Sequence, residues 1–318
     1  MSDSSAPWFR IQDKCYFFLH GDDAERYLNG QVSNNILKLR ENKTLAACLL
    51  TPKGKLCALL SISRSKLPCI NKSDGFLIES DLILRDTIST RLERYIISDD
   101  AHLLDLTGKL HGLHLLLPPE NLPAFSPAPL ATHQHRRLTT TGCDLWFSDE
   151  QSQPRLDSAT EISPTDLEHE RIRLGQPAWN YELNENTLPA EVGLDHSAID
   201  FHKGCYLGQE VISRIQSVGH VNHTLVHCCW TDPAFLPHPP LPLFLNEDAA
   251  NNSDTAKPVG KITSISPKKE TRTGLAIIHR QANKCSQLFT PVNKEHPKSI
   301  LRIELSPLSL HNSNNETL

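Results

Sequence analysis

Residues 201–219 have the sequence FHKGCYLGQEVISRIQSVG, in which a glycine-rich half is followed by a periodic apolar half. The second half predicts an amphipathic helix, because apolar residues recur every three or four positions and so share one helical face. These residues are Val211, Ile212, Ile215 and Val218. Gly219 is expected to end the helix.

The first half of this stretch is expected to form a tight loop that leads into the helix. Gly204 and Gly208 allow backbone angles and close approaches that a Cβ atom would prevent. The free N–H groups at the start of the helix, together with the charge of Lys203, favour an anion at this place. The same field is expected to make the thiol of Cys205 ionise more readily than that of a free cysteine.

A simpler interpretation of the stretch is also open. Glycine-containing turns often precede amphipathic helices, and a single cysteine is more often a small buried apolar residue than a nucleophile. The density of unusual residues favours the functional interpretation, because a helix needs none of them in order to fold. Residues 203–210 contain two Gly, one Lys, one Cys, one Gln and one Glu.

The composition is that of a globular protein on the polar side of the ordinary range. The 318 residues are enough for about two domains with a sizeable core. Hydrophobic residues make up 38% and charged residues 22%, and 22 Pro against 14 Gly suggest many stiff loops. The net charge of −5 gives no general basic surface. Direct nucleic-acid binding is therefore not expected, although a local basic patch stays compatible with RNA contact.

The cysteines and the N-terminus indicate the compartment. Nine Cys, an odd number without regular spacing, argue against a disulfide framework and for reducing surroundings. Residues 1–9 lack a signal pattern, and no apolar run is long enough to cross a membrane. We therefore expect a soluble cytoplasmic protein without a membrane partner.

The N-terminal part shows mixed strand and helix patterns. A strand is expected over residues 8–19 and a short helix over 24–29, followed by a polar loop at 31–35 that suits either a polar ligand or an ordinary turn. Two apolar runs on either side of TPKGK at 51–55 predict a hairpin. Further strands are expected at 76–79, 102–106 and 111–117, and a helix at 84–97.

The middle of the chain begins with a proline-rich segment, residues 118–135, which is expected to connect two halves. A strand is expected at 143–147. A helix is expected to start at the Ser163-Pro164 signal and to end at Gly175. Its charged residues, Arg171 among them, form by default a solvated face.

Beyond residue 219 the pattern becomes β, and four strands predict a small barrel or sandwich. The strands are expected at 224–230, 260–265, 274–278 and 300–305. The polar segment 246–257 is expected to be a mobile loop. The expected domains are an α+β region at 1–222 in two halves, a C-terminal β-barrel at 223–305, and a disordered tail at 306–318.

A segment rich in histidine and cysteine raises the alternative of a metal site. On a strand His223, His227 and Cys229 would share one face and could hold zinc. Because the segment, which also contains His220 and Cys228, has no CxxC or paired-histidine motif, no metal is expected. The chain also has no Walker loop, dinucleotide fingerprint or nucleophile elbow.

The segment KGCYLGQE at 203–210 resembles the signature of the YgfZ-type folate-binding proteins, relatives of the aminomethyltransferase (T protein) of the glycine cleavage system. Four other segments match in the same order, at 28–34, 51–55, 171–175 and 188–191. Residues 259–264 and 274–276 are similar to the C-terminal domain of that family. There are departures: Asn35 stands where relatives often carry Asp, and Arg173 and Leu174 replace a usual Glu-Ala.

This resemblance implies an α+β fold in which two ferredoxin-like halves and a C-terminal β-barrel surround a central channel for tetrahydrofolate or a derivative. It also implies an accessory role in the assembly or repair of iron–sulfur proteins, including tRNA-modifying enzymes. The implied partners are folate and iron–sulfur client or assembly proteins.

The resemblance also implies the site residues. Cys205 is the expected functional thiol. Arg171 lies where the T protein places a folate-contacting arginine. A folate needs an amide or carboxylate for its pterin, an apolar slot, and cations for its glutamate tail. The expected folate-binding residues are Lys203, Gly204, Tyr206, Gly208, Gln209, Glu210, Arg171 and Gln31.

Two other functions stay open at this point. The first is a folate-dependent one-carbon transferase of the aminomethyl type, so the sequence does not decide whether the protein is an enzyme. The second is an interaction module that binds no folate.

Overall fold

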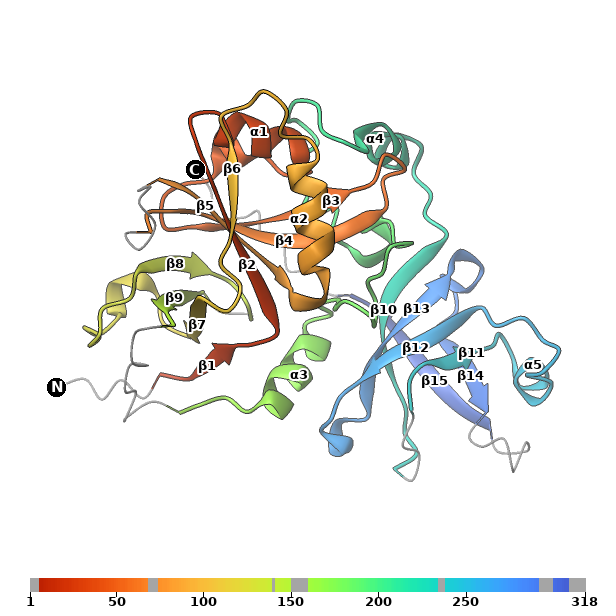
Figure 1. Ribbon diagram of the computed structural model, residues 1–318. Coiled ribbons are helices and arrows are strands. Elements are labelled where there is room, and N and C mark those ends of the chain that lie inside the picture. Colours follow the sequence, from red (N-terminus) through yellow and green to blue (C-terminus); the bar gives the residue numbers. More distant parts are fainter. Residues whose placement is uncertain are drawn as a thin grey trace. The chain divides into compact units, whose positions relative to one another are not determined.

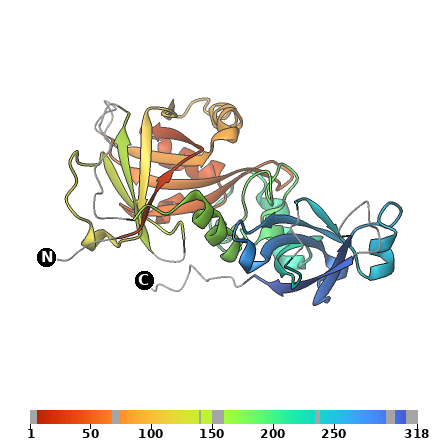
Figure 2. The same cartoon turned by 90° about the horizontal axis from the view of Figure 1, so that it is seen from below.

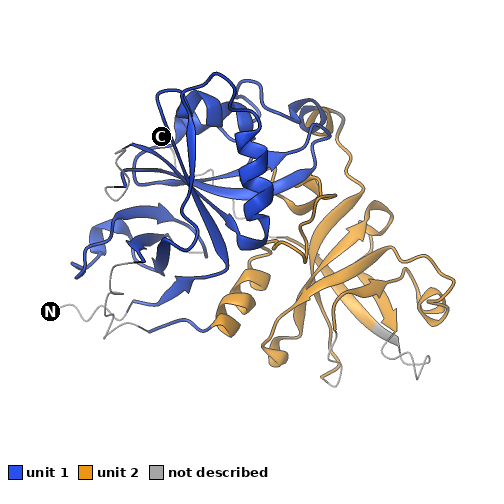
Figure 3. Ribbon diagram, in the orientation of Figure 1, with its two compact units in different colours: residues 1–163, 197–213 blue, residues 164–196, 214–318 orange. Residues whose placement is uncertain are grey.

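The computed structural model describes residues 6–67, 74–138, 141–149, 160–233, 238–291 and 300–308. Its elements divide into two units that alternate along the chain (Figure 3). Unit 1 consists of residues 1–163 and 197–213, and unit 2 of residues 164–196 and 214–318.

The larger sheet of unit 1 has five antiparallel strands in the order β3-β4-β5-β2-β6 (Figure 1). They are β2 (Lys14–His20), β3 (Thr44–Leu50), β4 (Leu56–Ser65), β5 (Gly75–Asp81) and β6 (His102–Asp105). Helix α1 (Ala24–Gln31) contacts β5, and helix α2 (Arg85–Glu93) contacts β4 and β6. The hairpin predicted around residues 51–55 is confirmed as β3 and β4.

The second sheet of unit 1 has four strands in the order β1-β7-β9-β8. They are β1 (Trp8–Ile11), β7 (Leu110–Leu115), β8 (Ala131–His135) and β9 (Gly142–Ser148). The single strand expected at 8–19 is interrupted at Asp13, whose φ of 54° is left-handed. The expected connection at 118–135 is shorter than predicted, because its last five residues pair with β9 as β8.

Apolar packing joins the two sheets of unit 1. Tyr16 and Phe18 of β2 pack in one cluster with Trp146 of β9 and Leu110 of β7. The rings of Tyr16 and Trp146 meet edge to face, with centroids 5.1 Å apart. Because β2 is buried along most of its length, its near-continuous apolar sequence belongs to a central strand.

A buried charged cluster also joins these sheets. Arg137 donates two hydrogen bonds to Glu79 of β5, at 2.8 and 2.5 Å, and pairs with Asp144 of β9 at 2.8 Å. His114 and His135 each lie 2.7 Å from Asp144 through Nδ1. Burial acts to raise the pKa of Asp144, but Arg137 and the histidines outweigh it and hold the pKa well below its usual value.

Unit 2 contains α3 (Pro164–Arg173) and a six-stranded antiparallel sheet in the order β11-β12-β13-β10-β15-β14. The strands are β10 (His223–Cys229), β11 (Leu241–Leu243), β12 (Gly260–Ile265), β13 (Thr273–His279), β14 (Gln287–Pro291) and β15 (Ile300–Pro307). Phe244 and Phe289 close this sheet at its edges by exchanging backbone hydrogen bonds of 2.8 and 2.9 Å. Figure 2 shows the strands of this barrel from a second side.

The predicted α+β class with a C-terminal β-barrel is confirmed. Two barrel strands, β11 and β14, were not predicted, because short strands that contain or end in proline resemble turns. The expected mobile loop at 246–257 contains α5 (Glu247–Asn251), which Asn246 caps by accepting from the backbone N–H of Ala249 at 2.8 Å. The tail expected at 306–318 begins later than predicted, because Ser306 and Pro307 pair with β10 as the end of β15. Residues 309–318 lie outside the described residues.

The remaining helices are short, apart from α4 (Gln209–Val218), which lies where it was predicted. The side chain of Val218 is outside the description. The helix expected at 84–97 ends as α2 at Glu93. Six 3₁₀ helices complete the described elements: Ile36–Lys38, Leu82–Leu84, Pro119–Asn121, Pro189–Val192, Lys269–Thr271 and Arg280–Ala282. Within the described ranges, no helix has the length and apolar character needed to span a membrane.

We expect acidification to destabilise unit 1 through His133. Burial lowers the pKa of His133 from 6.5 to about 4, so below pH 6.5 the unfolded chain binds a proton that the folded state does not. The contribution to the free energy of unfolding is complete above pH 6.5, and it falls by about 3 kcal/mol as the pH drops to 4, at about 1.4 kcal/mol per pH unit. Urea unfolding at pH 7 and pH 4, followed by tryptophan fluorescence, measures this loss.

The matched variant is His133→Gln, which does not titrate and can still accept the hydrogen bond from Trp146 Nε1, now 3.0 Å long. This variant should lose less stability on acidification than the parent protein. Equal losses in the two proteins would contradict the role given to His133.

Candidate functional site

The loop at residues 203–208 begins with a lysine that is anchored inside unit 1. The side chain of Lys203 is buried, and its Nζ donates to the backbone oxygens of Asn29 and Val32 at 2.6 Å and of Asn34 at 2.8 Å. Asn29 and Val32 belong to the last turn and C-cap of α1, which has no basic residue of its own in that turn. Lys203 thus supplies the cation that the negative end of this helix favours.

The environment of Lys203 differs from the one expected from the sequence, which placed its charge beside Cys205 as an attraction for anions. All three N–H groups of the ammonium are used by carbonyl oxygens of the chain. Burial lowers the pKa of Lys203 to about 8, and Asp200 partly opposes this fall. Lys203 is therefore an anchor of the loop, and its contact with folate stays a prediction.

The polar loop at residues 31–35 holds the segment that precedes Lys203. Ser33 Oγ donates to the carbonyl oxygen of Ala198 at 2.6 Å and accepts from the N–H of Cys48 at 2.8 Å. Asn34 Nδ2 donates to Ala46 O at 2.8 Å, and the N–H of Asp200 donates to Ser33 O at 3.1 Å. Of the two interpretations left open for this loop, ordinary backbone support accounts for Ser33 and Asn34.

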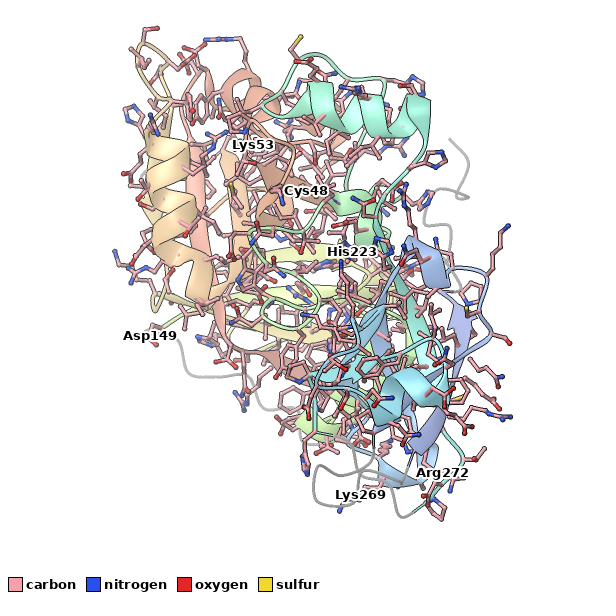
Figure 4. All side chains as sticks on the ribbon, turned by 90° about the vertical axis from the view of Figure 1, so that its right-hand side faces the viewer. Cys48, Lys53, Asp149, His223, Lys269 and Arg272 are labelled. Atoms are coloured by element: carbon pink, nitrogen blue, oxygen red, sulfur yellow. The ribbon has the colours of Figure 1, made fainter. Side chains whose placement is uncertain are left out.

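Two glycines let this loop pack against the predicted hairpin turn. Gly208 has a φ of +86°, and a Cβ there would lie 2.5 Å from the carbonyl oxygen of Thr51. Gly54 has a φ of +71°, and a Cβ there would lie 3.0 Å from the side chain of Val211. Figure 4 labels Lys53, which lies in this turn beside Gly54. The two segments therefore need glycine where their backbones meet.

Gly204 and Cys205 form the open part of the loop. Cys205 is exposed, whereas the other cysteines in the described part of the chain are buried or half-buried. A Cβ at Gly204 would have no neighbour within 4 Å. The alternative that Cys205 is a buried apolar residue is therefore wrong.

Tyr206 anchors the other side of the open part. The residue is 8% exposed, and Lys203 Nζ lies 5.2 Å from its ring centroid, within cation–π range. Burial raises the pKa of Tyr206 to about 12. Gln209 and Glu210 follow in the first turn of α4, where the exposed carboxylate of Glu210 suits the positive end of the helix.

Gln31, at the end of α1, is oriented by an arginine that the sequence did not single out. Arg91 Nη1 of α2 donates to Gln31 Oε1 at 3.0 Å. Because arginine has no acceptor, the amide oxygen of Gln31 must face Arg91, and the amide N–H groups face away from it. Gln31 can therefore offer donors to a ligand.

Arg171 lies on α3 in unit 2, whereas the other predicted site residues belong to unit 1. It donates from Nε and Nη2 to Glu168 at 2.8 and 2.7 Å, and from Nη1 to Gln176 O at 2.7 Å and Glu182 at 3.1 Å. Nη2 also donates to Ser264 Oγ at 2.8 Å. The chain itself thus satisfies all five N–H groups, and a contact with folate stays a prediction.

Glu182 is a residue that sequence reasoning missed. It is fully buried, and it accepts from Ala178 N at 3.0 Å and from Ser264 Oγ at 2.6 Å in addition to Arg171. A glutamate in a polar loop carries no local sign of burial, since its side-chain partners Arg171 and Ser264 come from α3 and β12. Only the tertiary structure shows that Glu182 links α3, its own loop and β12 through hydrogen bonds.

The side chains of His223, His227 and Cys229 each lie against another group of the chain. His227 Nε2 lies 3.0 Å from Ile172 O, His223 Nδ1 lies 2.9 Å from Glu191, and Cys229 Sγ lies 3.8 Å from Glu304. Figure 4 labels His223. The described residues contain no group of three or more His, Cys, Asp or Glu side chains that could hold a metal ion.

Comparisons with known proteins show what this chain resembles in sequence and in fold. No family model matches the chain. The chain is 28% identical over 241 residues to the tRNA-modifying protein YgfZ of Enterobacter sp. strain 638, over 66% of this chain and 67% of the relative. It is 31% identical over 238 residues to the mitochondrial iron-sulfur cluster assembly factor IBA57 homolog of Pyricularia oryzae, over 72% of this chain and 58% of the relative.

The alignments therefore span about half to two thirds of the relatives, down to 52% for the IBA57 homolog of Chaetomium globosum. Among solved structures, the glycine cleavage system aminomethyltransferase T of Bartonella henselae matches with a TM-score of 0.73. The match covers 96% of this chain and 86% of the other at 11% sequence identity, so it shows the fold.

Replacing Lys203 by Met should free the loop. One buried and two half-buried carbonyl oxygens would lose their donor, which we expect to lower the free energy of unfolding by about 2 kcal/mol or more. Amide hydrogen exchange at residues 197–208 should become faster. Lys53→Met, in the exposed hairpin turn, is the control and should change neither quantity. Unchanged exchange in the Lys203 variant would show that the anchor is not needed.

Proposed function

Because the chain is related in sequence to the YgfZ and IBA57 proteins and has the fold of aminomethyltransferase T, we propose that it is a folate-binding accessory protein in iron–sulfur cluster assembly or repair. Its clients would include tRNA-modifying iron–sulfur enzymes, and its ligand tetrahydrofolate or a derivative. The observation that carries the proposal is the exposed Cys205 on an anchored loop whose sequence matches the family signature.

The residues of unit 1 fit a reduced folate in three respects. The amide N–H groups of Gln31 face away from Arg91, so they suit a carbonyl oxygen in the p-aminobenzoyl-glutamate part of the folate. Gly204 is exposed and has no Cβ atom, so a flat ring of the ligand can lie against its backbone. Arg91 Nη2 is a buried donor without a hydrogen-bond partner, so an acceptor atom of the ligand would satisfy it.

The predicted residues then divide into two roles. Lys203, Tyr206 and Gly208 hold the loop in place, and Gly204, Gln209, Glu210 and Gln31 would contact the folate. Arg171 would act by fixing Glu182 and the loop that contains it. Cys205 would provide the thiol that binds a sulfur or iron species carried by a partner protein. Its exposure makes the thiol accessible to such a protein.

A folate-dependent one-carbon transferase is the second candidate, and the fold likeness to aminomethyltransferase T favours it. Calorimetric titration with tetrahydrofolate should show binding, and incubation with one-carbon donors should leave the folate unchanged. Conversion of the folate would favour the transferase instead. No binding at all would favour an interaction module and end the folate proposal.

Cys205→Ser should retain folate binding and lose the cellular function. In cells that lack the native protein, we expect this variant to restore little iron–sulfur enzyme activity, because the hydroxyl cannot replace a thiol toward sulfur or iron. Cys57→Ser, at a half-buried cysteine of the same unit, is the control and should rescue. Full rescue by the Cys205 variant would remove the proposed role of the thiol.

A further inference from the structure

The two cations that the sequence predicted for the glutamate tail, Lys203 and Arg171, are already hydrogen-bonded within the chain. The ammonium of Lys203 is used by three backbone oxygens. The guanidinium of Arg171 is used by two carboxylates, one carbonyl and one hydroxyl. A folate carries carboxylates on its glutamate tail, so a site for it needs a positive charge that the chain has not already neutralised.

Unlike Lys203 and Arg171, Arg91 keeps N–H donors that the described part of the chain does not use. It is half-buried on the last turn of α2, and Nη1 makes its hydrogen bond to Gln31, a predicted folate-binding residue. Nη2 is buried and has no hydrogen-bond partner. No carboxylate forms an ion pair with Arg91 anywhere in the ranges that the structure covers.

The charge of Arg91 acts on two neighbouring side chains, and an aromatic ring covers the guanidinium. Burial raises the pKa of the Cys57 thiol, and Arg91 opposes that rise. Burial also raises the pKa of Tyr27 to about 12, and Arg91 is the largest opposing influence. The ring of Tyr95 lies 4.3 Å from Arg91 Cζ and so covers the guanidinium with a π-face rather than with an anion.

A half-buried guanidinium without a counter-ion is costly to the chain unless a ligand pairs with it. Its planar fork matches a carboxylate with two parallel N–H···O bonds. We propose that Arg91 binds a carboxylate of the glutamate tail of the folate, in the role that the sequence gave to Lys203 and Arg171. This inference rests on the proposed function, because it assigns one contact of the same ligand.

The test compares two reduced ligands by calorimetric titration, tetrahydrofolate and a tetrahydropterin that lacks the glutamate tail. Arg91→Met should weaken tetrahydrofolate binding by about 10- to 100-fold, the range of a hydrogen-bonded charge pair, and should leave tetrahydropterin binding unchanged. Arg94→Met is the matched control. Arg94 is exposed and shares the contact with Tyr95, at 5.9 Å, so its loss should change neither affinity.

Gln31→Glu tests the same charge without removing Arg91. The new carboxylate would pair with the guanidinium, so the preference for tetrahydrofolate over tetrahydropterin should disappear while the melting temperature is kept or raised. Gln31→Leu leaves the guanidinium unpaired and should keep that preference. These variants decide the question if Arg91→Met does not fold.

The outcomes separate the two claims. If the parent protein binds no folate, the proposed function is wrong. If it binds folate, and both Arg91→Met and Gln31→Glu keep the preference for the ligand with the tail, the function stands and the role of Arg91 is overturned. A fall in melting temperature of the Arg91 variant with unchanged affinities would likewise make Arg91 a structural residue only.

Discussion

The candidate site depends on the insertion of one ammonium group into the end of a helix about 170 residues away in sequence. The fall in the pKa of Lys203 from 10.5 to about 8 corresponds to about 3 kcal/mol against the charged form. A hydrogen bond to a charged group contributes about 1.5 to 3 kcal/mol, and Lys203 makes three of them. Because a pKa of about 8 still lies above neutral pH, the lysine stays charged there, and its three bonds hold the loop to α1.

Close backbone packing supplies the second constraint on the loop. The carbonyl oxygen of Thr51 occupies the place of a Cβ at Gly208, and the side chain of Val211 lies against Gly54. The hairpin turn and the start of α4 can approach only because each contributes a glycine with positive φ. Two short motifs far apart in sequence are thus two halves of one contact, which explains why each has a glycine where the two segments meet.

The sequence predicted what depends on local pattern. The β3–β4 hairpin followed from Pro and Gly between apolar runs, and α4 followed from its helical spacing. The strands β11 and β14 did not follow, because three to five residues containing proline show no clear alternation. The partners of Lys203, Arg171 and Gln31 could not be predicted either, since each partner comes from another element and leaves no signal near the residue itself.

The same limit explains why charge was the least predictable property of the site. A lysine or arginine beside a glycine-rich motif suggests a free positive charge, but whether that charge is available depends on which carbonyls and carboxylates the fold brings to it. Lys203 and Arg171 both stabilise their own unit, and this use leaves Gly204 and Cys205 exposed between two buried anchors, Lys203 and Tyr206. An exposed thiol on a loop that is fixed at both sides is presented in one position, so a partner can meet it without first ordering the loop.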